Sequence, residues 1–419
     1  MPTTPTTPPP VRIDDLAEPR FPAPYDEMLA GMAAMAPSCP LEPEALLEAA
    51  ASAAGLDDFG DPAFREPLDV LTRSLRTESG LSPAGTVASH TQLVKFLVNR
   101  LRLVDLLRRH PEIHDVPVPG PIVIAGLPRT GTTHLHNVLA ADPALRALPY
   151  WEAVEPFPAP GDTREDRMAR TEAPLEVLNG VMPHFARMHE MTVDHAHEEI
   201  HLLALDLSTM LFETLGWVPS YRDWYRTTDQ APAYRTLRTC LQALTWLDAQ
   251  SGLPPRRWVL KSPQHLEQFG PLVAAFPDAT FVVTHRDPVA VTASMVTMVT
   301  YSARMHVERP DPAAYGAYWS ARLGDMLDAC RRDRELLPAE RSVDVRFDDL
   351  MADELGTVER IYRLAGQPFD DAARAATAGY LADHQRDRHG KVIYDLADFG
   401  LDPREVADRF RMYRERFGV

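Results

Sequence analysis

Residues 126–133 read Gly-Leu-Pro-Arg-Thr-Gly-Thr-Thr and stand directly between an apolar run and a helical pattern. The run at residues 121–126, PIVIAG, is short and β-branched, which is typical of a buried parallel strand. The segment that follows places Leu135 and Leu139 on one face of a helix. Two glycines five positions apart let successive N–H groups turn toward an anion at the helix N-terminus. The stretch therefore predicts an anion-binding loop in an α/β protein.

This loop departs from the ATP-binding pattern at one position. It resembles the Walker sequence GxxxxGK[ST], but Thr132 stands where the lysine belongs. Kinases and ATPases place that lysine on the β- and γ-phosphates. Its absence argues against triphosphate hydrolysis, while Arg129 and the loop hydroxyls remain able to hold one terminal phosphate.

The remainder of the chain repeats the strand-then-helix order. Buried strands are predicted at residues 258–260, 280–284 and 343–347, and helices at 266–276 and 289–298. This order indicates a P-loop type α/β fold in which a parallel sheet is flanked by helices.

The domain organisation follows from where these patterns begin. Residues 1–20 form an extended tail rich in Pro and Thr, and residues 21–118 form an all-α N-terminal region. The core is expected at residues 119–419, with a helical insertion at about 161–250. The clearest helix of the N-terminal region is predicted at 89–110.

Composition narrows the class of partner. The 419 residues include 43 Lys+Arg and 60 Asp+Glu, a net charge of −17, which argues against nucleic acid but permits a small polyanion. No apolar run reaches the ~18 residues of a membrane span, and the N-terminus lacks the features of a signal peptide. The cysteines Cys39, Cys240 and Cys330 have no C-x-x-C spacing, so a reducing cytoplasm is expected, without a disulfide framework.

Two further segments bring cations to the same edge of the predicted sheet. Arg286 follows one strand, and Ser294 lies about two turns into the next helix, where its hydroxyl could share an anion. The strand at 258–260 delivers Lys261 and His265, which could stabilise negative charge and take a proton from a hydroxyl. Taken alone, each of these four side chains could instead be a solvated or structural residue.

A zinc motif offers a different interpretation. The sequence His197-Glu-Glu-Ile-His201 satisfies HExxH, with two histidines one turn apart on an expected helix and Glu198 as base. Glu213 is available as a third ligand, although the segment is rich in histidine, which makes a chance match easier.

Together the loop, the lysine–histidine strand and the arginine–serine pair resemble the sulfotransferases that use 3′-phosphoadenosine 5′-phosphosulfate (PAPS). The resemblance is closest to the bacterial family whose loop reads GLPR[ST]GTT, and it runs from Pro121 to the C-terminus. It implies that the 5′-phosphosulfate binds the loop residues Arg129, Thr130, Gly131, Thr132 and Thr133. It also implies that Arg286 and Ser294 bind the 3′-phosphate.

The resemblance extends to three other places. Lys261 and His265 are similar to the lysine-x-histidine motif of the animal enzymes, with three residues between them instead of one. The ending from residue 388 resembles the closing segment of the family, so Arg388 and Lys391 would add charge for the 3′-phosphate. The adjacent carboxylates of the family correspond to Glu198 and Glu199.

The sequence thus predicts a cytoplasmic, PAPS-dependent sulfotransferase that acts on a hydroxyl or amine of a small, apolar acceptor. His265, or failing it Glu198 or Glu199, would take the acceptor proton, and Lys261 would neutralise the leaving oxygen without any metal. An ATP-dependent small-molecule kinase, a zinc hydrolase built on His197 and His201, and a non-catalytic nucleotide-binding protein stay open as alternatives. The acceptor and the oligomeric state are not readable from the sequence.

Overall fold

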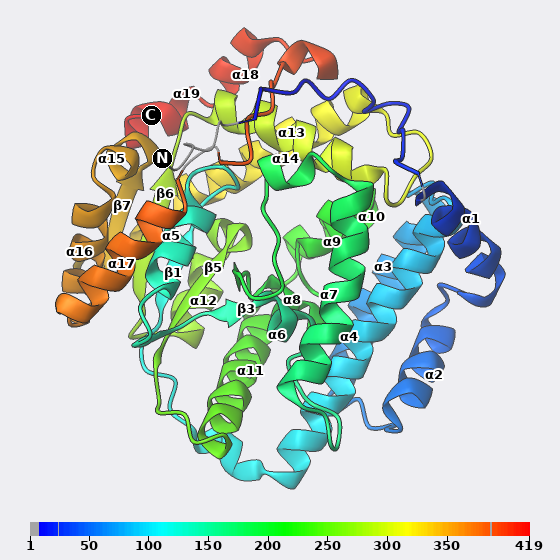
Figure 1. Cartoon of the computed structure of the whole chain (residues 1–419), viewed down its shortest axis with the longest axis horizontal. Coiled ribbons are helices and arrows are strands. Elements are labelled where there is room, and N and C mark those ends of the chain that lie inside the picture. The colour runs from blue at the N-terminus through cyan, green and yellow to red at the C-terminus, as the bar shows by residue number, and fades with distance from the viewer. Residues whose placement is uncertain (1–7, 24, 386–387) are drawn as a thin grey trace, which may run out of the picture.

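A five-stranded parallel sheet forms the centre of the protein (Figure 1). It is seen in a computed structural model that describes residues 8–23, 25–385 and 388–419. In spatial order the strands are β2 (Leu145–Arg146), β5 (Arg257–Ser262), β1 (Ile122–Ala125), β6 (Thr280–His285) and β7 (Ser342–Arg346). Every neighbouring pair is parallel, which confirms the predicted α/β fold.

The central strand β1 divides the core into two layers because its side chains alternate between the faces of the sheet. Ile122 and Ile124 belong to one apolar cluster, and Val123 and Ala125 belong to the other. All four residues are buried, as predicted for the run PIVIAG. A strand with both faces covered in this way occurs where helices pack on each side of a parallel sheet.

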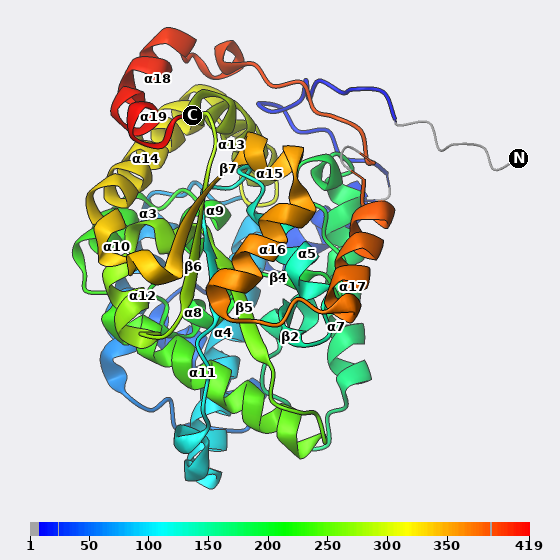
Figure 2. The same ribbon diagram turned by 90° about the vertical axis from the view of Figure 1, so that its left-hand side faces the viewer.

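The helices after the loop and near the C-terminus cover the first face, and Figure 2 shows α16 and α17 in front of the strands. These are α5 (Thr132–Ala140), α15 (Phe347–Ala352), α16 (Glu354–Ala365) and α17 (Asp371–Asp383). On the other face lie α12 (Phe269–Ala275), α13 (Pro288–Ala303), α14 (Pro312–Asp333), α18 (Pro403–Arg409) and α19 (Arg411–Phe417).

The N-terminal region is helical and packs against the same second face. It contains α1 (Tyr25–Met35), α2 (Pro43–Ala54), α3 (Arg65–Thr77) and α4 (Pro83–Arg109). Helix α4 begins six residues before the predicted start at 89, because Ser82 caps it: the Ser82 Oγ accepts from the N–H of Gly85 at 3.0 Å. Pro83 in the first turn fits that start, since a proline there costs no hydrogen bond.

The insertion, at about residues 161–250, is mainly helical. Its helices are α7 (Arg164–Val181), α8 (Ile200–Leu203), α9 (Leu211–Leu215), α10 (Pro219–Thr227) and α11 (Ala231–Gln250), and α6 (Tyr150–Val154) lies just before it. The two-residue strands β3 (Leu148–Pro149) and β4 (Ala196–His197) pair antiparallel. These strands and β2 were not predicted, since two residues carry no readable periodicity.

The chain near its N-terminus is tied to the chain near its C-terminus. The Val11 N–H donates to the Lys391 carbonyl, and the Ile393 N–H donates to the Val11 carbonyl, both at 2.9 Å. The buried Arg304 then pairs with Asp15 at 2.9 Å. From residue 8 onward the expected extended tail is thus a bonded segment that lies across the core, while residues 1–7 fall outside the described residues.

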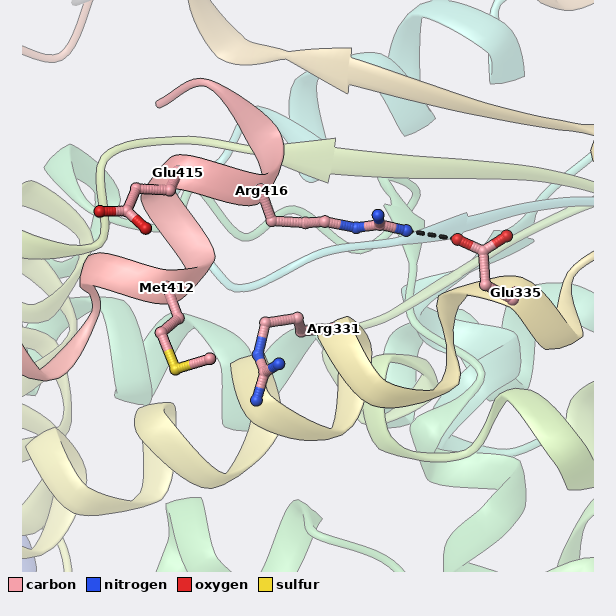
Figure 3. A pocket seen from close by; sticks show the side chains of 5 residues that line it. All are labelled: Arg331, Glu335, Met412, Glu415 and Arg416. Atoms are coloured by element: carbon pink, nitrogen blue, oxygen red, sulfur yellow. Dashed lines mark hydrogen bonds and ion pairs between the residues drawn. The ribbon is translucent and has the colours of Figure 1, made fainter.

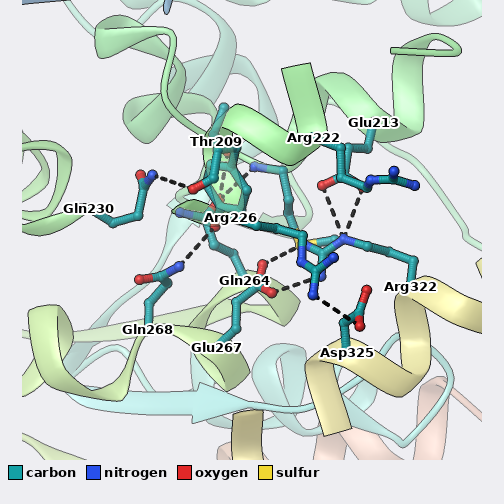
Figure 4. A network of polar contacts seen from close by, with 12 residues as sticks. Thr209, Glu213, Arg222, Arg226, Gln230, Gln264, Glu267, Gln268, Arg322 and Asp325 are labelled. Atoms are coloured by element: carbon teal, nitrogen blue, oxygen red, sulfur yellow. Dashed lines mark hydrogen bonds and ion pairs between the residues drawn. The ribbon is translucent and has the colours of Figure 1, made fainter. Parts of the chain in front are cut away.

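A buried ion triad joins helix α14 to the insertion and to the sheet. Arg322, on α14, donates to both oxygens of Glu213, on α9, and to both oxygens of Glu267 (Figure 4). Glu267 closes the 3₁₀ turn η6 (Pro263–Glu267), which follows strand β5. The guanidinium side chain and Glu213 have no exposed surface, so each charge depends on the other for its solvation.

Replacing Arg322 by Met should therefore destabilise the fold. Two carboxylates would lose their partner inside the protein, which typically costs about 3–5 kcal/mol of unfolding free energy. Urea unfolding followed by circular dichroism measures this loss. The matched control is Arg416→Met, which removes the exposed Arg416–Glu335 pair in the open hollow beside α19 (Figure 3) and should cost at most about 1 kcal/mol. Equal losses in the two variants would contradict the role given to the triad.

Candidate active site

The anion-binding loop is tightly wrapped at the carboxyl end of β1. Gly131 has a φ of +89°, a left-handed conformation that favours glycine, and Thr132 then opens helix α5. A Cβ on Gly126 would lie 1.9 Å from the Oγ1 of Thr284, so a side chain has no room there. The Thr130 Oγ1 lies 2.7 Å from the Leu127 carbonyl, to which it donates. The loop thereby points the α5 N-terminus at the edge of the sheet, where an anion is favoured.

The register of the strands brings the other predicted residues to this edge. Ala125, the last residue of β1, lies opposite Ser262 of β5 and Val283 of β6. Lys261 lies opposite Ile124, and Arg286 follows β6, which runs past the position opposite Ala125. The two cations consequently stand on either side of the loop, at the carboxyl edge of the sheet.

Two arginines and a serine form a linked group beside the loop. The Arg129 Nε donates to the Ser294 Oγ at 3.1 Å, and one Arg286 guanidinium N–H donates to the Arg129 carbonyl at 2.7 Å. The Arg286 guanidinium also stacks 4.1 Å from the ring centre of Phe347. Arg129 itself has a φ of +71°, an uncommon conformation for a residue other than glycine. The residues expected at the 5′ and 3′ groups thus belong to one connected cluster.

Lys261 links the loop to the insertion. Its ammonium donates to the Thr133 Oγ1 at 3.3 Å and pairs with the Glu198 carboxylate. Its backbone N–H donates to the Glu199 Oε2 at 2.8 Å. The Lys261 side chain is only 2% exposed, whereas that of Glu198 is 18% exposed. Of the two adjacent carboxylates, Glu198 is therefore the one that a substrate can reach.

His265 is fully buried, and both of its ring nitrogens are occupied. Nδ1 lies 2.8 Å from the Tyr234 hydroxyl, and Nε2 bonds the Glu199 Oε1. Burial acts to raise the pKa of Glu199, but the charge and hydrogen bond of His265 outweigh it and lower the pKa below its usual value. This arrangement differs from the expectation that His265 is the general base, since a base needs a lone pair that faces the substrate. Glu199, which belongs to the motif HEEIH, is the carboxylate that holds the His265 ring.

The zinc interpretation of HEEIH is corrected by the backbone. His197 lies in strand β4 and His201 in helix α8, so the motif is not carried by a single helix. The His197 Nε2 is 3.2 Å from the His201 Nδ1, and Glu198 turns away to Lys261. Within the described residues no group of three or more His, Cys, Asp or Glu side chains is arranged to hold a metal ion.

The histidines of this region are uncharged at neutral pH. Burial lowers the pKa of His201 to about 4 and that of His189 to about 3, and it lowers the pKa of His197 well below its usual value. Nearby positive charge, from Lys95 at His201 and from Lys261 at His189, lowers the values further. The insertion thus presents neutral imidazoles toward the cationic cluster.

Arg388 and Lys391 lie on the segment after α17, apart from the loop residues. Arg388 donates to both oxygens of Glu190, and the Lys391 carbonyl accepts from Val11. The segment that carries Arg388 is connected to the loop indirectly, through Glu190 and the residues before it. The Met188 carbonyl accepts a hydrogen bond from the Arg129 guanidinium of the loop.

Sequence reasoning missed Tyr234, Thr284 and Glu190. Thr284, whose Oγ1 is 2.6 Å from that of Thr130, directly precedes the His-Arg pair at the end of β6, and that position was a usable signal. Tyr234 and Glu190 sit in helical or irregular stretches of the insertion, where no pattern marks them.

A parallel α/β sheet with a glycine-containing loop between its central strand and the following helix defines a P-loop-like fold. Residues 121–371 match the model of the sulfotransferase family, and the chain belongs to this family. It is a sulfotransferase, which replaces the kinase and zinc hydrolase alternatives.

Solved and curated relatives agree with this assignment. The sulfotransferase STF1 of Mycobacterium tuberculosis is 33% identical with a TM-score of 0.76, and the similarity covers 88% of this chain and 97% of STF1. STF9 of Mycobacterium avium is 26% identical with a TM-score of 0.79, covering 90% and 96%. The omega-hydroxy-beta-dihydromenaquinone-9 sulfotransferase Stf3 of Mycobacterium bovis is 26% identical over 273 residues, 63% of this chain and 67% of Stf3. None of the described helices combines the length and apolar character needed to cross a membrane.

The pairing of Glu199 with His265 predicts a pH-dependent contribution to stability. Glu199→Gln should lower the unfolding temperature strongly at pH 7, because an amide cannot offer anionic oxygens to both the buried Lys261 N–H and the His265 ring. The folded-state pKa of Glu199 lies below the ordinary value of about 4.3, so the stabilisation is present above that pH and is lost as the pH falls through the folded value. The difference between wild type and variant should therefore shrink below about pH 4.

Thermal unfolding at a series of pH values measures this difference. Glu112→Gln, which removes the carboxylate of the exposed His110–Glu112 pair, is the matched control and should change little. A difference for Glu199→Gln that stays constant from pH 7 to below pH 4 would contradict the ion-pair assignment.

Proposed function

We propose that this sulfotransferase takes its sulfuryl group from PAPS and transfers it to a hydroxyl, or an amine, of a small, apolar acceptor. The observation that carries the proposal is the connected cluster in which Arg129 bonds Ser294 and is itself bonded by Arg286. PAPS has anionic groups at both its 5′ and 3′ positions, and a cluster that joins two arginines across two sheet loops suits such a ligand.

The loop would hold the 5′-phosphosulfate. The N–H groups of residues 130–133 stand at the N-terminus of α5, and the hydroxyls of Thr132 and Thr133 lie beside them. Arg286 and Ser294 would receive the 3′-phosphate, with Arg388 and Lys391 adding charge from the C-terminal segment. A bound triphosphate would find no Walker lysine in this loop to contact its β- and γ-phosphates.

In the proposed reaction an acceptor oxygen attacks sulfur as the bond from sulfur to the 5′-phosphate oxygen breaks. Lys261 neutralises the charge that develops on that leaving oxygen, and adenosine 3′,5′-bisphosphate departs. Glu198 receives the acceptor proton, since it is the carboxylate with an exposed edge beside the Lys261 ammonium. An incoming donor draws the ammonium toward its own oxygen, which releases Glu198 from the ion pair.

His265 and Glu199 would position these groups without taking the proton. Glu199 fixes both the Lys261 backbone and the His265 ring, so the strand end that carries the lysine is held in place. The scheme needs no metal ion.

An apolar acceptor is supported by the neutral imidazoles of the insertion and by the half-buried Tyr150, whose ring lies 4.8 Å from that of His197. The relative named for omega-hydroxy-beta-dihydromenaquinone-9 also points to a hydroxyl on an apolar molecule. The free, buried cysteines Cys39, Cys240 and Cys330 support a reducing compartment, the cytoplasm, as the place of action.

The choice of nucleotide tests the donor. Adenosine 3′,5′-bisphosphate should raise the unfolding temperature far more than ATP, with or without Mg²⁺, because ATP has no 3′-phosphate for Arg286 and Ser294. Arg286→Ala should weaken binding of the bisphosphate by about 1.5–3 kcal/mol and leave ATP binding unchanged. Calorimetric titration measures both affinities. Stronger stabilisation by Mg·ATP, or an unaltered affinity in Arg286→Ala, would contradict the proposed donor site.

The base is tested by comparing two variants. Glu198→Gln should lower kcat by about 10²–10⁴-fold, because the proton acceptor is lost, while adenosine 3′,5′-bisphosphate still binds. The assay follows transfer from radiolabelled PAPS to the best acceptor in a panel of phenols and hydroxylated lipids. His265→Asn is made in parallel. If it loses turnover with an unchanged unfolding temperature while Glu198→Gln stays active, the base is His265.

A further inference from the structure

Arg388, a residue expected at the 3′-phosphate, is held by a carboxylate in the free protein. One of its terminal nitrogens donates to both oxygens of Glu190, at 2.6 and 2.7 Å. The His389 Nε2 lies 3.0 Å from the same carboxylate. The side chains of Arg388 and Glu190 are 32% and 35% exposed, so a ligand can reach the pair.

Glu190 ends a short segment that contacts both halves of the proposed donor site. In that segment, residues 187–190, Arg187 donates to the Lys391 carbonyl at 3.3 Å and to the Pro9 carbonyl at 2.8 Å. The next residue, Met188, accepts from the Arg129 guanidinium through its carbonyl. Four consecutive residues thus bind the phosphate-loop arginine on one side and the C-terminal segment on the other.

The chemistry of Glu190 makes it a substitute for a phosphate. Burial acts to raise its pKa, but the hydrogen bond of Arg388 and the charge of His389 outweigh this and hold the pKa below the usual value. It is therefore a full anion at neutral pH, and it uses the guanidinium as a phosphate would. Both Glu190 oxygens accept from one terminal nitrogen of Arg388, so a 3′-phosphate that takes this nitrogen displaces Glu190.

We propose that Glu190 lowers the affinity of the donor site for a 3′-phosphate, as an internal competitor that the phosphate displaces from Arg388. The inference rests on the proposed function, since it takes Arg388 as a ligand of the 3′-phosphate. A nucleotide with a 3′-phosphate replaces Glu190 and releases residues 188–190, whereas one without it leaves the Glu190–Arg388 pair in place. Because transfer leaves the 3′-phosphate unchanged, Glu190 weakens the binding of PAPS and of adenosine 3′,5′-bisphosphate alike.

The Glu190–Arg388 pair could act in a different way, which the experiment must distinguish from competition. Glu190 could instead keep its bond to Arg388 when nucleotide is bound and so close residues 187–190 over the ligand. The two arrangements predict opposite signs, because removal of a competitor strengthens binding and removal of a closing contact weakens it.

Calorimetric titrations of the full chain with adenosine 3′,5′-bisphosphate and with ADP separate them. Glu190→Gln should bind the bisphosphate about 3- to 10-fold more tightly, the scale of a partly exposed ion pair, and should bind ADP as the wild type does. Glu335→Gln removes the carboxylate of the distant Arg416–Glu335 pair and should change neither affinity. Unfolding temperatures show that each variant is folded.

An Arg388→Ala background makes the test specific. There Glu190→Gln should have no effect on the bisphosphate, since the contested guanidinium is gone. Unchanged or weaker binding by Glu190→Gln alone, or an equal gain in both backgrounds, overturns the proposal. Wild-type protein that fails to bind the bisphosphate would instead refute the proposed donor, and that outcome is distinct from a variant that binds no better than wild type.

Discussion

The site depends on three neighbouring parallel strands whose carboxyl ends lie at one edge of the sheet. Because β1 lies between β5 and β6, the chain leaves the sheet at the same edge after Ala125, Ser262 and His285. Burial of both faces of β1 enforces this register, since a shift by one residue would exchange the two apolar clusters. The loop, the lysine and the arginine converge for this reason, although they come from separate parts of the chain.

Positive side chains that lie close together repel one another in the free protein. Hydrogen-bond acceptors and carboxylates of the chain itself offset this repulsion. Arg129 bonds Ser294 and the Met188 carbonyl, Lys261 pairs with Glu198, and Arg388 pairs with Glu190. Under the proposed function, the affinity for the donor is a difference between the contacts that form and the contacts that are given up. Removing such an internal acceptor would then strengthen binding, whereas removing a cation would weaken it. The insertion supplies most of these acceptors, from Met188, Glu190 and Glu198.

The sequence predicted the architecture well and the site in part. The helices and the longer strands were readable from local periodicity, and α4 began early only because of the Ser82 cap. The zinc alternative for HEEIH assumed one helix, whereas His197 lies in strand β4 and His201 in helix α8. Between them, Glu199 turns inward to hold Lys261 and His265. The role of His265 also could not be read, since its partners Tyr234 and Glu199 come from distant segments.

The sequence by itself determined the glycine-containing loop after β1 and the parallel α/β core, because these follow from short-range spacing and burial patterns. Only the tertiary structure decided which groups are free to act. Arg129 reaches Ser294 across 165 positions of sequence, and Glu199 reaches His265 across 66. Whether a carboxylate or an imidazole keeps a lone pair for a substrate depends on such long-range contacts, and no local pattern encodes them.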